Sequence, residues 1–201
     1  DKLEEITDYH KQINMKTVAD DFIETETDEN GVLTKISFKN EDKFNFAFDC
    51  VDKIAEKNPC KLAMLWVSNE KKEHRFTFAD MKKYSNMTAN YLESLGIGKG
   101  DRVMLVLKRH YQFWFTMLAL HKIGAIAIPA TNQLVEHDFT YRYEAAGVKA
   151  IICTSDGDVS EQAEKASEGF PDMIKVIVGG KKQGWHDYNS EMMLCSDIYE
   201  R

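Results

Sequence analysis

The apolar residues in the second half of the chain gather in four short runs. These runs are rich in valine, isoleucine and leucine, and they predict strands over 102–107, 125–129, 149–154 and 174–180. Each run is continuous rather than alternating between apolar and polar residues, which is typical of strands that are buried on both faces. We therefore expect all four strands to lie inside a sheet that is covered on both sides.

Segments with helical spacing fill the three intervals between these strands. They predict helices over 111–124, 136–147 and 159–169. The first helix is apolar on nearly every side, which indicates an enclosed helix rather than a surface helix. Strands and helices that alternate in this way form a parallel sheet with right-handed crossovers. The expected fold class is α/β, with a mostly parallel, doubly wound β-α-β sheet and flanking helices.

The preceding segment predicts one helix and one hairpin. An apolar stripe at helical spacing predicts a helix over 46–57, which Asn58 and Pro59 end. "KLAMLWV" at 61–67 predicts a buried strand, and "EHRFTF" at 73–78 predicts its hairpin partner.

The hairpin leads into a long predicted helix. Thr77 and Asp80 have the spacing of a capping box, in which side chains at the start of a helix accept hydrogen bonds from free backbone N–H groups. The helical spacing continues to Leu95, and Gly96 suits the left-handed residue that often follows a helix.

The first 43 residues differ from the rest of the chain. They are polar and broken by turn signals, with one expected strand at 32–38 after the Asn30-Gly31 turn. We expect residues 1–43 to be an N-terminal extension and residues 44–201 to be one subdomain. The missing initiator methionine and the abrupt end of the sequence suggest a truncated chain.

Composition and charge narrow the functional classes. The 201 residues are 43% hydrophobic, which is enough for a sizeable core. A formal net charge of −7 and a pI near 5.4 argue against a nucleic-acid-binding surface. No apolar run approaches the ~18 residues of a membrane span, and the acidic N-terminus does not resemble a signal peptide.

The cysteines and histidines do not form a recognisable reactive or metal-binding pattern. Cys50, Cys60, Cys153 and Cys195 lack CxxC spacing, and we interpret them as free, mostly buried thiols of a reducing compartment, which predicts a cytoplasmic protein. No order of serine, histidine and aspartate indicates a catalytic triad. We therefore expect no metal site and no catalytic residue within this chain.

The glycine-rich segment "GIGKGD" at 96–101 is not a phosphate-binding loop. Such a loop follows a strand and opens a helix, so that backbone N–H groups at the start of the helix meet the phosphate. Here the glycines follow a predicted helix and precede a strand, which indicates a helix end and a turn.

Two other polar segments follow predicted strands, where ligands of open parallel sheets bind. In "KRH", after the first strand, Arg109 pairs either with a phosphate or carboxylate of a ligand or with an acidic residue of the protein. In "ATNQL", after the second strand, the three polar residues either contact a ligand or form an ordinary turn that caps the next helix. These residues are Thr131, Asn132 and Gln133.

A third polar segment, "TSDGD", follows the third strand. Its Ser155 and Asp158 predict capping of the next helix. Core or interface positions are expected for the three tryptophans, Trp66, Trp114 and Trp185.

Three longer segments carry a family likeness: "FNFAFDCVD" at 44–52, "RFTFADM" at 75–81 and "GIGKGDRVMLVLKRHYQFWFTMLALHKIGAIAIPATNQL" at 96–134. Together they resemble the adenylate-forming (AMP-forming) acyl-CoA synthetases, with the closest likeness to the medium-chain, acetyl-CoA synthetase-like branch. The likeness extends to about Gly180. It implies that residues 44–201 are the N-terminal part of the large domain of such an enzyme.

The resemblance implies a ligation in two steps. ATP, with Mg²⁺, activates a short- or medium-chain carboxylic acid as an acyl-adenylate, and the acyl group then passes to coenzyme A. Gln133 matches a glutamine that contacts coenzyme A in the medium-chain branch, so the resemblance assigns cofactor binding to this one residue. Asn132 stands where the family commonly has threonine. "HYQ" replaces a Val-Pro-Glu type of helix start, so no role is transferred to Arg109.

Several family motifs are absent from this sequence, namely the Ser/Thr/Gly-rich phosphate loop, the aromatic-Gly-x-Thr-Glu segment and the catalytic lysine. The resemblance therefore implies that the main ATP and Mg²⁺ sites lie beyond residue 201 and that the isolated chain is inactive. The implied partners are the carboxylic acid, ATP, coenzyme A and the rest of the protein's own chain. An exposed apolar face could also support a homo-oligomer.

Two other functions remain open from the sequence. The chain could be part of an amino-acid or aryl-acid adenylating domain, because the residues of the acid pocket lie outside it. It could also be a non-catalytic α/β binding module.

Overall fold

The computed structural model describes residues 19–201, and the chain divides into two compact units, Asp1–Phe44 and Asn45–Arg201. In the first unit, β1 (Ile23–Thr27) and β2 (Leu33–Phe38) form an antiparallel pair. Asp28 accepts hydrogen bonds from two backbone N–H groups of the turn, and Gly31 adopts a positive φ of 78°. The strand predicted at 32–38 is confirmed. The sequence did not predict β1, because its residues are mostly polar and exposed. Two short 3₁₀ helices flank the pair, η1 (Ala19–Asp21) and η2 (Glu41–Lys43).

The second unit is built on a five-stranded sheet whose strands are all parallel. Its order is β6-β5-β7-β8-β9, so β6 and β7 flank β5 on opposite sides. This is one of the two common doubly wound orders, and the predicted α/β fold class is confirmed. The strands are β5 (Arg102–Val106), β6 (Ile126–Pro129), β7 (Ala150–Thr154), β8 (Ile174–Val178) and the short β9 (His186–Asp187).

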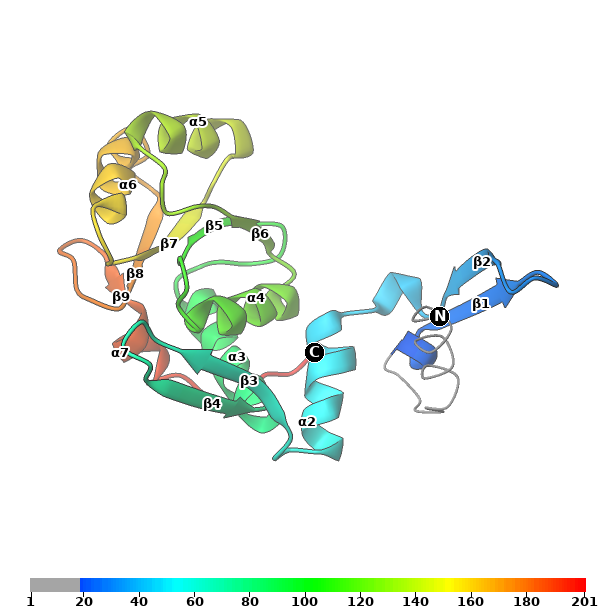
Figure 1. Ribbon diagram of the computed structural model, residues 1–201. Helices are drawn as coiled ribbons and strands as arrows, with labels where there is room; N and C mark the ends of the chain where they lie inside the picture. Colours follow the sequence, from blue (N-terminus) through cyan, green and yellow to red (C-terminus); the bar gives the residue numbers. More distant parts are fainter. Residues whose placement is uncertain (1–18) are drawn as a thin grey trace. The chain divides into compact units, whose positions relative to one another are not determined.

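Helices cover both faces of this sheet (Figure 1). On one face, α3 (Phe78–Ser94), α4 (Gln112–Ile123) and α7 (Tyr188–Met192) share a buried apolar cluster with the strands. On the other face, α5 (Glu136–Ala146) and α6 (Val159–Ser167) form a second cluster. β7 is buried at every position, as the continuous pattern predicted.

The prediction that all four main strands are buried on both faces is wrong for β6. This strand is at the edge of the five-stranded sheet, and Ile126 is 46% exposed. An edge strand has a neighbour on one side only, which leaves part of its surface open. The expected enclosure of α4 is largely confirmed, but Trp114 lies on its open side and is 54% exposed, so Trp114 is not a core residue.

A separate two-stranded sheet consists of β3 (Leu62–Val67) and β4 (Glu73–Thr77). The predicted hairpin is confirmed, but the prediction that its first strand is buried is wrong. One face of the pair packs on an aromatic cluster that includes Phe76 and Phe115, whereas Leu65 and Val67 are about half exposed. Among residues 45–201, the hairpin has a packing partner on one face only.

The predicted limits of α3 are confirmed. The Thr77 hydroxyl accepts a hydrogen bond from Asp80 N, and the Asp80 carboxylate accepts one from Thr77 N, which completes the capping box. Gly96 follows the helix with a positive φ of 87°.

The helix predicted at 46–57 is α-helical only in its second half. Ala47–Asp52 (η3) forms a π-helix, and α2 (Lys53–Lys57) continues from it. The apolar stripe is buried as expected, but the carboxylates of Asp49 and Asp52 are buried beside it, each residue being 6% exposed. A buried carboxylate is stable only with a hydrogen-bonded or charged partner.

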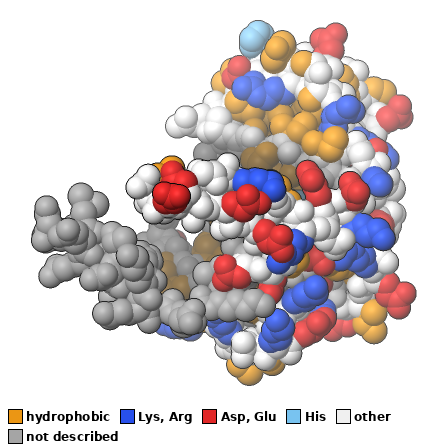
Figure 2. Space-filling model, turned by 90° about the vertical axis from the view of Figure 1, so that its right-hand side faces the viewer, with side chains coloured by type: hydrophobic (Ala, Val, Ile, Leu, Met, Phe, Trp, Pro, Cys, Tyr) orange, Lys and Arg blue, Asp and Glu red, His pale blue; other side chains and the backbone are white. Residues whose placement is uncertain are grey.

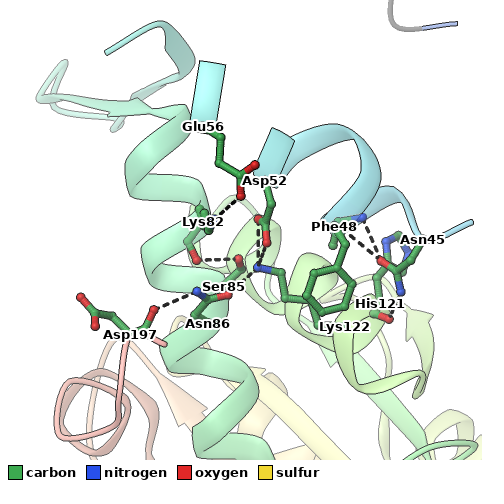
Figure 3. Close-up of polar contacts among 11 residues, drawn as sticks. Asn45, Phe48, Asp52, Glu56, Lys82, Ser85, Asn86, His121, Lys122 and Asp197 are labelled. Atoms are coloured by element: carbon green, nitrogen blue, oxygen red, sulfur yellow. Dashed lines mark hydrogen bonds and ion pairs between the residues drawn. The ribbon is translucent and has the colours of Figure 1, made fainter. Parts of the chain in front are cut away.

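Lys122 of α4 is the partner of Asp52 (Figure 3). Its Nζ atom lies 2.9 and 3.0 Å from the two carboxylate oxygens of Asp52, and it also donates a hydrogen bond to Asn86 Oδ1 of α3. The Lys122 side chain is fully buried. Burial raises the pKa of Asp52 and lowers the pKa of Lys122, because both charged groups have left water. The pair joins η3 to α3 and α4.

We expect Lys122→Met to lower the free energy of unfolding by about 3–5 kcal/mol, because it leaves a buried carboxylate without its partner. The double variant Asp52→Leu/Lys122→Met should recover most of this loss, since neither charge is then buried. Chemical denaturation measures both effects.

Lys82→Met is the matched control for this prediction. It removes the ion pair between Lys82 and Glu56, whose side chain is 62% exposed. This control should cost far less, because exposed ion pairs contribute little to stability. Equal losses for Lys122→Met and Lys82→Met would contradict the prediction.

Candidate functional site

The strand order opens a crevice at the carboxyl ends of β5 and β7. β5 continues into α4 on one face of the sheet, whereas β7 continues into α6 on the other face. The two chain segments therefore separate at this point. Crevices of this kind are the usual ligand sites of open parallel sheets.

A cleft with a volume of about 480 Å³ lies at this crevice. Its walls come from four segments, namely the turn of the β3–β4 hairpin and the residues that follow β5, β6 and β7. The side chains that line it include Trp66, Glu70, Lys108, Arg109, His110, Asn132, Gln133 and Asp156. The structure thus brings the two polar segments after β5 and β6 to one site.

Gln133 lies exposed at the cleft. Its backbone N–H donates to Thr131 Oγ1 over 3.3 Å, and its side-chain amide makes no hydrogen bond within residues 19–201. The polar segment does not cap α5. The N-terminal N–H groups there are bound instead by the side chains of Asp138 and Gln162. The amide of Gln133 is therefore available to a ligand.

The residues after β5 form a tight turn. The N–H group of His110 donates to the carbonyl of Leu107 over 2.9 Å, and Lys108 adopts a positive φ of 48°. The indole N–H of Trp66 donates to the carbonyl of Arg109 over 2.6 Å. The Arg109 side chain is exposed and makes no ion pair within the described residues. Of its two predicted roles, pairing with an acidic residue is not observed among residues 19–201.

His110 points toward the ends of the neighbouring strands. Its Nε2 atom lies 2.7 Å from Thr154 Oγ1 and 3.6 Å from Asp156 Oδ2. Burial lowers the pKa of His110, and Lys108 lowers it further, whereas Asp156 raises it. A side chain on Gly179, which has a φ of 88°, would lie 3.1 Å from the His110 ring. The positive φ strains any residue other than glycine at this position, and a Cβ atom there would also crowd the His110 ring.

The sequence did not connect these residues. It placed His110 in a polar segment but gave it no partner, because Thr154 ends a different strand, β7, and Asp156 follows it. The predicted parallel sheet could have indicated these contacts, because the carboxyl ends of adjacent parallel strands meet at one edge.

The capping prediction for Ser155 and Asp158 is not confirmed. Asp158 occupies the position before α6, but its side chain makes no capping hydrogen bond. Ser155 instead packs against Gly180, where a Cβ atom would lie 2.9 Å from the serine side chain.

The core or interface position expected for the tryptophans is confirmed for Trp185, which is buried. Trp66 is only half-buried.

The described residues carry few other site features. Within 19–201, no group of three histidine, cysteine or acidic side chains is arranged to hold a metal ion. None of the helices in this range is long and apolar enough to span a membrane. The cysteines are free thiols, although Cys60 is exposed rather than buried. On the face drawn in Figure 2, acidic and basic side chains are interspersed.

Sequence comparisons relate most of this chain to known enzymes. A family model described as "AMP-binding enzyme" matches residues 51–191. Acyl-coenzyme A synthetase ACSM5, mitochondrial, of Rattus norvegicus is 33% identical over 161 residues, which cover 76% of this chain and 28% of the relative. Acyl-coenzyme A synthetase ACSM2A, mitochondrial, of Homo sapiens is 35% identical over 153 residues, which cover 73% of this chain and 26% of the relative. The chain therefore spans little more than a quarter of the length of these relatives.

Structural comparisons support the same fold. The anthranilate CoA ligase AuaEII, solved with anthranoyl-AMP, has a TM-score of 0.65 at 19% identity, covering 78% of this chain and 29% of that chain. A benzoate CoA ligase from Burkholderia xenovorans has a TM-score of 0.64 at 17% identity, covering 76% and 29%. The described fold therefore resembles the N-terminal part of CoA ligases.

We expect the imidazole of His110 to titrate below the ordinary pKa of about 6.5 in an NMR pH titration. Asp156→Asn should lower this pKa further, because it removes a favourable charge, and Lys108→Gln should raise it. Since the unfolded chain binds the proton more readily, the contribution of His110 to stability should be lost as pH falls below about 6.5. Shifts of the same sign in both variants would contradict this account.

Proposed function

The chain belongs to the AMP-binding enzyme family, and from this premise we propose that it is part of an ATP-dependent acid–CoA ligase. The named relatives are acyl-CoA synthetases, which supports this reaction class. In the first step, a carboxylate oxygen attacks the α-phosphorus of ATP and pyrophosphate leaves. In the second step, the coenzyme A thiol attacks the acyl carbon and AMP leaves.

We assign one edge of the coenzyme A site to this cleft, which lies at the carboxyl ends of β5, β6 and β7. The observation that carries this assignment is the side-chain amide of Gln133, which is exposed there without a partner in residues 19–201. Lys108 and Arg109 line the same cleft and offer positive charge. Coenzyme A carries several phosphate groups, so a cleft with an amide and two cations suits its chemistry.

The other parts of the proposed reaction require groups outside this chain. We propose that ATP and Mg²⁺ are bound mainly by the remainder of a longer protein, because this chain spans 28% of a relative such as ACSM5. We propose a short- or medium-chain fatty acid as the substrate. An aryl acid is the second candidate substrate, because the two similar solved structures are ligases of anthranilate and benzoate. The cytoplasmic expectation is not supported, because the relatives are named as mitochondrial.

We expect Gln133→Ala to slow the thiolation half-reaction of the intact enzyme by about 2- to 10-fold, which corresponds to one neutral hydrogen bond of about 0.5–1.5 kcal/mol. Adenylate formation should change little. Single-turnover assays of the two steps measure this split. Thr131→Ala is the control for the local turn, because Thr131 Oγ1 accepts the N–H of Gln133. Equal losses in both steps would indicate a folding role for Gln133.

The isolated 201-residue chain should not catalyse ATP–pyrophosphate exchange with acetate, octanoate or benzoate. Exchange requires a complete triphosphate cradle and a metal that neutralises the developing charge. Radiolabelled pyrophosphate incorporation into ATP measures this activity. Robust exchange by the isolated chain would overturn the assignment of the ATP site to another part of the protein.

A further inference from the structure

The hydrogen bond between Trp66 and Arg109 links two separate sheets. Trp66 belongs to β3 of the hairpin, whereas Arg109 follows β5 of the five-stranded sheet. The indole N–H of Trp66 reaches the Arg109 carbonyl over 2.6 Å. The hairpin therefore acts directly on the backbone of the turn that carries two of the cations of the cleft.

This turn has a backbone conformation that needs support. Lys108 has a φ of 48°, in the left-handed region that residues other than glycine rarely adopt. Such conformations persist where surrounding contacts hold them, and they are concentrated at functional sites. Two hydrogen bonds hold this one, from His110 N to the Leu107 carbonyl and from Trp66 to the Arg109 carbonyl.

The Trp66 ring is itself held in place. The rings of His74 and Tyr111 meet it edge-on, each with a centroid distance of 5.4 Å. Tyr111 also contacts Phe76 at 5.0 Å, and Phe76 contacts Phe115 of α4 at 5.2 Å. The aromatic cluster therefore fixes the position of the Trp66 ring, and the hydrogen bond from this ring fixes the backbone of the turn.

The charges on this turn favour an anion. Lys108 Nζ lies 4.0 Å from Asp156 Oδ2, so its charge is only partly balanced. Arg109 makes no ion pair within residues 19–201. The other acidic residue that lines the cleft, Glu70, accepts a hydrogen bond from Ser68. Within residues 19–201, the guanidinium of Arg109 is thus the least compensated cation of the cleft, and guanidinium groups bind phosphate through two parallel hydrogen bonds.

We propose that Trp66 is a positioning residue, whose indole N–H holds the Leu107–His110 turn so that Lys108 and Arg109 bind a phosphate or diphosphate group in the cleft. The identification of this group as part of coenzyme A rests on the proposed function. The anion site itself does not.

Binding of inorganic pyrophosphate to this chain tests the proposal by titration calorimetry at low salt. Trp66→Phe keeps an aromatic ring but removes the donor, and it should weaken binding about 2- to 10-fold. Trp114→Phe is the matched control, because Trp114 is 54% exposed and lies outside the cleft. It should bind pyrophosphate as the unmodified chain does. The melting temperatures of the two variants should agree closely.

A double-mutant cycle separates positioning from a general effect on folding. If Trp66 acts through the turn, Trp66→Phe should have little further effect on affinity in a Lys108→Ala/Arg109→Ala background. The proposal is overturned if the unmodified chain does not bind pyrophosphate, if Trp66→Phe binds it equally well, or if the loss is the same in both backgrounds.

Failure of the proposed function has a different signature. Pyrophosphate binding would then still depend on Trp66, whereas coenzyme A would not compete with pyrophosphate for the site. If the proposed function holds, coenzyme A competes, and Gln133→Ala weakens coenzyme A more than pyrophosphate.

Discussion

The position of β5 between β6 and β7 is the constraint on which the candidate site depends. Two strands that follow β5 in the chain lie on its opposite sides, so the connections after β5 and β7 pass to opposite faces of the sheet. A crevice must open where they separate. The hairpin of β3 and β4 closes one side of this crevice. The indole N–H of Trp66 joins the hairpin to the five-stranded sheet by donating to the carbonyl of Arg109. The cleft therefore results from topology first and from side chains second.

Much of the fold could be predicted from local pattern, and the errors have physical causes. The buried strands β7 and β8 and the capped helix α3 follow from apolar runs, helical spacing and a capping box, all of which are local. The exposure of β3 and β6 depends on how many neighbours each strand has, which no local pattern contains. The π-helix over Ala47–Asp52 was missed because its apolar stripe also fits an α-helix. β9 and α7 were missed because each is five residues or shorter.

The candidate site divides in the same way. The places of Arg109 and Gln133 at the ends of strands were predictable, because strand ends can be read from the sequence and parallel strands share an edge. The partners of His110 and the contact of Trp66 with the turn were not. Those contacts join residues 44 and 43 positions apart in the chain. They depend on the register of the strands and on the placement of the hairpin, which only the folded chain determines.

The buried pair of Asp52 and Lys122 has a consequence for how this sequence can change over evolutionary time. The two residues are 70 positions apart, yet each makes the other tolerable in an apolar interior. A substitution at either position alone leaves a buried charge without its partner, whereas simultaneous replacement of both residues does not. We therefore expect changes at this junction of η3, α3 and α4 to occur at both positions together rather than at one position alone.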